Sequence, residues 1–209
     1  MRELRTAVIA IVAISLVCGL AYPLVMTGVG QTVFGGPADG SLVKSGGKVV
    51  GSKLIGQDFS RDTGRKDKDG NAILAPDLRY FQSRPSATGY SPSATFFNNL
   101  GPNQQDLADL LKANLKTYLD RERPATPGLR ASQVPSDAVT TSASGVDPDI
   151  SERNADIQAN RVARRRGLSR GRVLALIGAH TSHPLLGLAG KGSVNVLELN
   201  LALDRESTR

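Results

Sequence analysis

The sequence predicts an α+β domain anchored by one N-terminal transmembrane helix. An uncharged, mostly apolar stretch runs from Thr6 to Ala38, helical patterns follow residue 100, and the few strand-like segments do not alternate regularly with helices. Removing the anchor leaves about 170 residues, the size of one ordinary domain. We expect a cytoplasmic N-terminus with the membrane helix (1–34), a linker (35–47), an extracytoplasmic α+β domain (48–204) and a tail (205–209).

The anchor is predicted from the length of its apolar run. Residues from Thr6 to Met26 would extend about 30 Å as a helix, which matches the hydrocarbon thickness of a bilayer. A cleaved signal peptide is the alternative, because arginines precede the run and the small residues Gly19 and Ala21 could form a cleavage site. The run is longer than the roughly 7–15 apolar residues of a signal peptide. We therefore expect an uncleaved anchor in contact with membrane lipid.

Flanking charges and small residues predict how the anchor is placed. Two arginines precede it and no Lys or Arg follows until Lys44, so the N-terminus is expected in the cytoplasm and the domain in the periplasm or outside the cell. Pro23 predicts a kink, after which glycines should unwind the helix. Ser15 and Gly19 are small residues four apart, a spacing that favours packing against another membrane helix. The sequence thus predicts a single-pass protein of the bacterial cytoplasmic membrane.

The charge balance excludes one class of partner. The chain carries a net charge of +7, but an exported domain does not meet nucleic acid in ordinary function, so we expect no nucleic-acid partner. The strongest basic run is a solvated helix face by default, with docking on an acidic partner or on lipid headgroups as the alternative. It consists of Arg161, Arg164, Arg165, Arg166, Arg170 and Arg172.

The domain is expected to hold three helices, a strand near each of its ends, and loops between them. A polar loop is predicted for 61–75, and a connection with three prolines for 122–136. A strand and turn are predicted for 48–59, and strict alternation of leucines predicts a half-buried strand for 194–204. The predicted helices run from an N-cap at Asn103 to Pro124, from a cap at Ser151 to Gly167, and from a cap at Ser169 to near Gly178.

None of the motifs in the chain that resemble functional sites predicts a catalytic residue or a metal site. The segment GKGS at 190–193 lacks the Lys-Ser/Thr step of a phosphate-binding loop and reads as a turn. His180 and His183 have no further ligands nearby and favour a helix terminus. The segment TTSASGVDPDIS at 140–151 is rich in hydroxyls, glycine and acids. It fits an ion or phosphate site, but a turn that feeds a capped helix is preferred.

Six ordered blocks of the chain resemble the KdpC family, the C subunit of the Kdp potassium-transporting P-type ATPase. The blocks are GSKLIGQDF (51–59), YFQSRPSA (80–87), NLGPNQQDL (99–107), TTSASGVDPDIS (140–151), QANRVARRRGL (158–168) and VNVLELNLALD (194–204). The resemblance implies a non-catalytic accessory subunit that helps to assemble a channel-like potassium-binding subunit with an ATP-hydrolysing subunit. It also implies a role as a catalytic chaperone that raises the ATP affinity of the pump subunit.

The resemblance leaves open whether this chain itself binds ATP. A domain outside the membrane cannot touch a cytoplasmic ATP site, so an effect on ATP affinity would have to pass through the membrane helix. The alternatives are direct ATP binding within 140–168 and a free-standing anchored protein that binds an anion. The candidate residues for ATP or a partner are Ser142, Ser144, Gly145, Asp147, Gln158 and Arg161.

Overall fold

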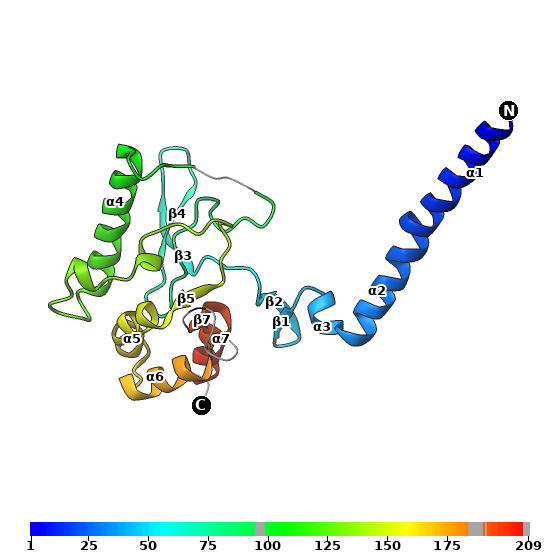
Figure 1. Ribbon diagram of the computed structural model, residues 1–209. Coiled ribbons are helices and arrows are strands. Elements are labelled where there is room, and N and C mark those ends of the chain that lie inside the picture. The colour runs from blue at the N-terminus through cyan, green and yellow to red at the C-terminus, as the bar shows by residue number, and fades with distance from the viewer. Residues whose placement is uncertain (95–98, 184–189, 191, 207–209) are drawn as a thin grey trace.

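A helical rod at the N-terminus stands apart from an α+β domain that holds all of the buried residues described (Figure 1). The computed structural model describes residues 1–94, 99–183, 190 and 192–206. The rod consists of α1 (Arg2–Leu16), a π-helical turn (Val17–Ala21) and α2 (Tyr22–Val33). Its 32 residues are apolar enough to cross a membrane, and none of its residues is buried.

The π-helical turn explains how the rod accommodates proline. Pro23 lies in the first turn of α2 and has no N–H to donate, and its ring crowds the carbonyl four residues earlier. The wider π turn directly before α2 relieves this crowding. In Figure 1 the rod runs on without a sharp bend. The expected kink is therefore absent, and the helix continues past Gly28 and Gly30 to Val33.

The rod is followed by a short helix and a hairpin. Helix α3 (Gly35–Ala38) leads into strand β1 (Leu42–Ser45), which pairs antiparallel with β2 (Lys48–Ser52). Gly46 and Gly47 form the turn with φ of 56° and 78°, the positive values that a tight two-residue hairpin requires. The strand predicted to begin at Lys48 is confirmed, whereas β1 lies within the segment expected to be a linker.

The prediction of a loop for 61–75 is wrong, because this segment forms a second hairpin. Strand β3 (Ser60–Lys66) pairs antiparallel with β4 (Ala72–Pro76). The Asp67 carboxylate accepts hydrogen bonds from the backbone N–H of Asp69 (2.9 Å) and of Asn71 (2.8 Å). These bonds close the turn. The hairpin is mostly exposed on both faces, so its sequence lacks the apolar alternation of a half-buried strand.

The three predicted helices of the domain are confirmed, with one boundary corrected. Helix α4 (Gln105–Glu122) begins after Gln104, so Asn103 is not its N-cap. Helix α5 (Glu152–Arg166) begins where Ser151 Oγ accepts a hydrogen bond from the backbone N–H of Asn154 (3.1 Å). It ends at Gly167, whose φ is +66°. Helix α6 (Arg170–Ala179) begins at the cap Ser169. A short 3₁₀ turn, 131–133, lies within the predicted connection, and a second, 136–138, begins at its last residue.

The prediction of a strand for 194–204 is also wrong. Only β7 (Ser193–Asn195) is extended, and it pairs antiparallel between β5 (Asp149–Ser151) and β6 (Thr181–Ser182). Helix α7 (Val196–Glu206) follows it. The side-chain oxygen of Asn195 accepts a hydrogen bond from the backbone N–H of Glu198 (3.1 Å), which is an N-cap interaction. The buried Val196, Leu199 and Leu203 recur at helical spacing.

Helix α5 lies between the two hydrophobic clusters of the domain. One face packs against α6, α7 and the small sheet through residues such as Ala159 and Val162, and its Ile157 joins the smaller cluster with α4. Phe81 belongs to the larger cluster although it lies outside any helix or strand. The segment around Phe81 therefore crosses the core and needs partners for its backbone.

Candidate functional site

The structure separates the six predicted ATP or partner residues into two groups. One group lies in the loop before β5, and the other is buried on α5. Within the described residues, no hydrogen bond joins the two groups directly. The loop group is Ser142, Ser144, Gly145 and Asp147, and the helix group is Gln158 and Arg161. The assignment of these residues to ATP or to a partner stays a prediction.

The loop group is packed against the segment that follows the core-crossing chain. The carboxylate of Asp147 forms an ion pair with Arg84 (2.8 Å), and Ser86 Oγ donates a hydrogen bond to the carbonyl of Gly145 (2.6 Å). Gly145 has a φ of +73°, and a Cβ there would lie 2.6 Å from Thr88 Oγ1. Both the backbone and the space therefore require glycine, which agrees with the preferred interpretation of a structural turn.

Arg161 is buried in a network that joins α4, α5 and the segment 78–80. Its Nε donates to both carboxylate oxygens of Glu122 (3.1 and 3.0 Å). Its Nη1 donates to the carbonyls of Leu78 (2.7 Å) and Tyr80 (2.9 Å), and its Nη2 donates to Gln158 Oε1 (2.8 Å). Arg161 is 3% exposed and Glu122 is 0% exposed. Every nitrogen of this guanidinium is therefore engaged inside the protein.

Two amide side chains supply the backbone partners of the core-crossing segment. Gln158 accepts from the N–H of Gln82 (2.8 Å) and donates to its carbonyl (3.1 Å). Asn200 does the same for Phe81, with both hydrogen bonds at 2.9 Å. A buried chain without a neighbouring strand is stable only if its polar groups are paired in this way. Gln158 thus has a defined structural role.

Burial shifts the pKa of two groups in this network. Burial raises the pKa of Tyr118, and the negative charge of Glu122 raises it further. The phenol donates a hydrogen bond to Asn154 Oδ1 (2.9 Å). Burial lowers the pKa of Arg161, whereas the carboxylate of Glu122 opposes this shift. The ordinary pKa of arginine lies far above neutrality, so Arg161 and Glu122 form a charged pair.

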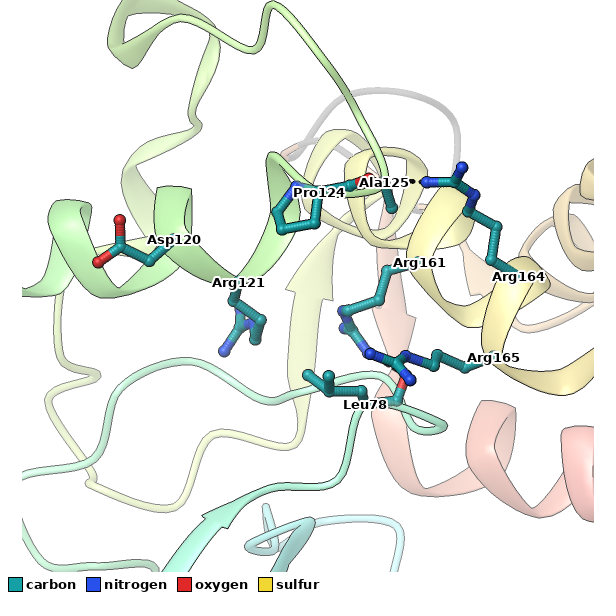
Figure 2. A pocket seen from close by; sticks show the side chains of 8 residues that line it. All are labelled: Leu78, Asp120, Arg121, Pro124, Ala125, Arg161, Arg164 and Arg165. Carbon is teal, nitrogen blue, oxygen red and sulfur yellow. Dashed lines mark hydrogen bonds between the residues drawn. The ribbon is translucent and has the colours of Figure 1, made fainter.

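An arginine-lined cavity of about 370 Å³ opens beside this network. Figure 2 shows Arg121 on one side of the space and Arg161 and Arg165 on the other, with Arg164 near Pro124. The basic run was predicted to be a solvated helix face, which holds for the exposed Arg164 and Arg165 but is wrong for the buried Arg161. No sequence signal indicated that Arg121 of α4 faces this run. The lining residues are Leu78, Asp120, Arg121, Pro124, Ala125, Arg161, Arg164 and Arg165.

The two histidines occupy different settings. His180 is the C-cap of α6, and its Nδ1 lies 2.8 Å from the carbonyl of Leu176, as predicted for a helix terminus. His183 follows β6, and its Nδ1 lies 3.9 Å from Glu152 Oε1. The two histidines therefore do not share a helix face. Among the residues described, no three His, Cys, Asp or Glu side chains are grouped to hold a metal ion.

The small residues of the rod lie on open surface. Ser15 belongs to α1 and Gly19 to the π-helical turn, and both are exposed. A Cβ added at Gly19 would meet no atom within 4 Å. The rod thus offers a small-residue surface at its π turn, and packing of another helix on that surface stays a prediction.

Comparison with known proteins agrees with the resemblance. A family model described as the c chain of the K⁺-transporting ATPase, KdpC, matches residues 4–205. A potassium-transporting ATPase KdpC subunit from Rhodopseudomonas palustris is 43% identical over 209 residues, which is all of both chains. The subunit of the same name from Variovorax paradoxus is 46% identical over 96% of this chain and 95% of its own. That from Caulobacter vibrioides is 45% identical over 97% and 92%.

These matches cover the rod and the α+β domain together. No separate relationship is needed for either part, because the family model begins at Leu4 and ends at Arg205. The full-length identity and the family match together establish that the chain belongs to the KdpC family, the c chain of K⁺-transporting ATPases.

Proposed function

We propose that this chain is the accessory subunit of an ATP-driven potassium import complex, where it supports the assembly and stability of the channel-like and ATP-hydrolysing subunits. Membership of the KdpC family over residues 4–205 supports this role. The observation that carries it is the rod, which has 32 residues and no buried side chain. Such a surface is stable only when lipid or other membrane helices cover it.

The far end of the rod favours protein as its neighbour. The 32 residues extend about 48 Å as a helix, whereas the hydrocarbon core is about 30 Å thick. If Thr6 lies at one edge of the core, the other edge falls near Met26. Val29, Val33 and Phe34 then lie beyond the hydrocarbon and are all exposed. These apolar side chains need a cover other than lipid.

The β1–β2 hairpin continues this apolar surface. Leu42, Val49, Val50 and Leu54 are exposed large apolar residues on or next to the hairpin. The hairpin begins eight residues after Phe34, so its apolar residues follow closely in sequence on those at the end of the rod. We assign both surfaces to a partner subunit of the same complex. We refer to them together as the juxtamembrane surface, and its members are Val29, Val33, Phe34, Leu42, Val49, Val50 and Leu54.

We infer from the charges around the rod that the domain lies outside the cytoplasm. Arg2 and Arg5 precede the uncharged stretch, and the next basic residue is Lys44, so the N-terminus is cytoplasmic by the positive-inside rule. The cytoplasmic ATP site of the pump subunit is then out of reach of the α+β domain. An effect on ATP affinity is accordingly a coupling free energy carried through the rod.

Copurification from native membranes tests the assembly role. Replacing the rod by an unrelated apolar helix of equal length keeps the membrane attachment but removes Ser15, Gly19 and the π turn, and we expect loss of the partner subunits. Leu54→Gln, within the juxtamembrane surface, should weaken copurification. Leu74→Gln is the matched control, because Leu74 is similarly exposed but lies on β4. Recovery of the unaltered chain without partners would instead favour a free-standing anchored protein.

Cysteine labelling tests the orientation. Cys18 is the only cysteine in the sequence, so Cys18→Ser gives a background without thiols. Asp69→Cys, on the exposed β3–β4 turn, should react with an impermeant maleimide added to intact spheroplasts. Glu3→Cys should react only after lysis. The reverse pattern would contradict the proposed topology while leaving the assembly role to be judged by copurification.

A further inference from the structure

The arginine-lined cavity holds more positive charge than its carboxylates neutralise. Four arginines line it, at 121, 161, 164 and 165, together with one carboxylate, Asp120. Asp120 is engaged with Lys116 (2.6 Å), and its side chain points away from the cavity in Figure 2. Glu122 lies behind the wall, where it pairs with both Arg121 (2.7 Å) and Arg161 (3.0 Å). Neither carboxylate is therefore left for Arg164 or Arg165.

The helix ends account for only part of this excess. Both α4 and α5 end near the cavity, and each C-terminus carries about half a negative charge. Together they balance about one guanidinium. Arg164 uses Nη1 to donate to the carbonyl of Pro124 (2.7 Å), and the described residues offer Arg165 no hydrogen bond or ion pair. Glu122 supplies one negative charge and the helix ends about one more, so about two of the four positive charges stay uncompensated at the cavity.

The arginines are held in position to different degrees. Arg121 is fixed by its ion pair with Glu122 and lies over the ring of Tyr118, 5.1 Å from its centroid. Its Nε makes the bond to Glu122, and its terminal nitrogens have no hydrogen-bond partner among the described residues, so they can bind a ligand. Arg164 is held by Pro124, whereas Arg165 is exposed and unrestrained in the described part of the chain. Two preset donors and one adaptable donor therefore face one space.

We propose that this cavity binds a small oxyanion of the phosphate class, with Arg121, Arg164 and Arg165 as its ligands. The planar guanidinium matches tetrahedral oxyanions through paired hydrogen bonds. The volume of about 370 Å³ suits a small molecule. The apolar lining is limited to Leu78, Pro124 and Ala125. Arg161 contributes charge from the wall but makes no direct contact, because its nitrogens are engaged.

The position of the cavity favours a soluble source of the phosphate group. In Figure 1, α4 and α5 lie on the side of the domain away from the rod. A lipid headgroup near the membrane end of the rod would lie on the opposite side of the domain. The binding chemistry is nevertheless common to both sources, so the test includes each of them.

Equilibrium dialysis of the full chain in a phosphate-free glycoside detergent, with radiolabelled orthophosphate as probe, tests the proposal. We expect saturable binding of one orthophosphate per chain, competed by sulfate but not by chloride at equal ionic strength. Arg165→Gln should weaken binding by about tenfold or more, since it removes a charge-assisted hydrogen bond. Arg205→Gln, an exposed arginine on α7, is the matched control and should bind as the original chain does.

Competition separates the two sources. Glycerol phosphate, a monoester dianion, should displace orthophosphate at least as well as the diester short-chain phosphatidylglycerol if the ligand is soluble, whereas preferential displacement by the lipid would identify a headgroup. Either result supports the site, provided that Arg165→Gln also weakens the binding of orthophosphate. Absence of saturable binding, or equal binding by Arg165→Gln and Arg205→Gln, would overturn it. Arg165 makes no hydrogen bond or ion pair with the described residues, and unchanged thermal unfolding of the variant would show that the comparison is valid.

Discussion

The rod and the α+β domain differ in which side chains they expose and which they bury. The rod exposes apolar side chains along its whole length and buries none, whereas the domain buries charged and amide side chains in its interior. Glu122, Gln158 and Arg161 are each at most 3% exposed. The rod therefore depends on its surroundings for stability, whereas the domain pairs these three buried side chains with internal partners.

The difference separates two kinds of mutational effect. A change in the buried network should reduce the stability of the domain, because an unpaired buried charge has no solvent to replace its partner. A change on the rod should leave the domain unaffected and alter association only. The first effect is measured by urea unfolding of the full-length chain in detergent micelles, monitored by circular dichroism. Copurification measures the second.

The largest expected effect comes from breaking the buried pair. Glu122→Ala leaves Arg161 charged and buried, which should lower the free energy of unfolding by about 3–5 kcal/mol. Asp120→Ala is the matched control on the same helix. Its carboxylate pairs with Lys116 at the surface (2.6 Å), and the expected loss is about 0.3–0.5 kcal/mol. Equal losses in the two variants would show that the domain does not rely on this pair.

A paired replacement sharpens the same point. Glu122→Leu combined with Arg161→Met removes both charges, so it should be less damaging than Glu122→Ala alone, as found for buried ion pairs in general. The recovery should be partial, because the carbonyls of Leu78 and Tyr80 and the guanidinium of Arg121 lose their partners. If the double variant were less stable than Glu122→Ala, the hydrogen bonds to Leu78, Tyr80 and Arg121 would contribute more to stability than the ion pair itself.

The second prediction distinguishes helix from strand at the C-terminal end of the domain. Leu199 is 0% exposed, whereas Leu201 is only partly buried. Leu199→Ala should cost about 2–5 kcal/mol of stability, and Leu201→Ala clearly less. A strand with alternating burial would place 197, 199, 201 and 203 on one face and make the two substitutions equivalent. Unfolding measurements on both variants decide between these arrangements.

Local rules predicted the elements whose signals lie within a few residues. Ser151, Gly167 and Ser169 were identified correctly because capping depends on neighbouring backbone groups. The rod was predicted for a similar reason, since its length and lack of charge need no knowledge of the rest of the fold. The π turn was not predicted, because no local sequence signal indicated that the helix would accommodate Pro23 without a sharp bend.

Tertiary contacts decided the elements that the sequence misplaced. The leucines of 197–203 alternate, yet burial of α7 on several sides lets the same residues pack as a helix, and Asn195 caps it. The exposed β3–β4 hairpin lacks apolar alternation because it has no buried face. In the candidate site, Arg161 was singled out from the α5 segment, but its partner Glu122 lies 39 positions away. Nothing in local sequence connects the two.

The third prediction compares two glycines with positive φ. Gly145 (φ +73°) would place a Cβ 2.6 Å from Thr88 Oγ1, whereas Gly128 (φ +84°) has open space. Gly128→Ala should cost about 1–2 kcal/mol from the left-handed backbone alone. Gly145→Ala should cost more, because Thr88 must also move. Similar losses, measured by urea unfolding, would mean that Thr88 yields freely and that the loop before β5 is not tightly fitted.

The fourth prediction concerns alkaline pH. Burial raises the pKa of Tyr90 to about 12, while an unfolded tyrosine ionises near pH 10. Between these values the unfolded chain loses the proton first, so the stability of the domain should fall as pH rises from about 10 to 12, by up to about 1.4 kcal/mol per pH unit from this group. Tyr118 adds to the fall, since burial also raises its pKa.

Tyr90→Phe isolates the contribution of this phenol. The variant loses the hydrogen bond from Tyr90 to the carbonyl of Arg84 (2.6 Å), so it should be less stable at neutral pH but show a shallower decline above pH 10. Absorbance titration follows the ionisation directly, because the sequence has no tryptophan. An unchanged slope would assign the alkaline loss to Tyr118 and Tyr80, whose pKa burial also raises.

The smallest expected effect on stability lies on the rod, and it is the one that separates the two regions. Gly19→Val fills an open position at the π turn, where a Cβ meets no atom within 4 Å. The free energy of unfolding of the domain should change by less than about 0.5 kcal/mol, because the rod shares no core with it. Copurification of the partner subunits should nevertheless decrease, since a branched side chain keeps another helix from close approach. A loss of domain stability in this variant would contradict the independence of the two regions, and unimpaired association would move the packing surface away from Ser15 and Gly19.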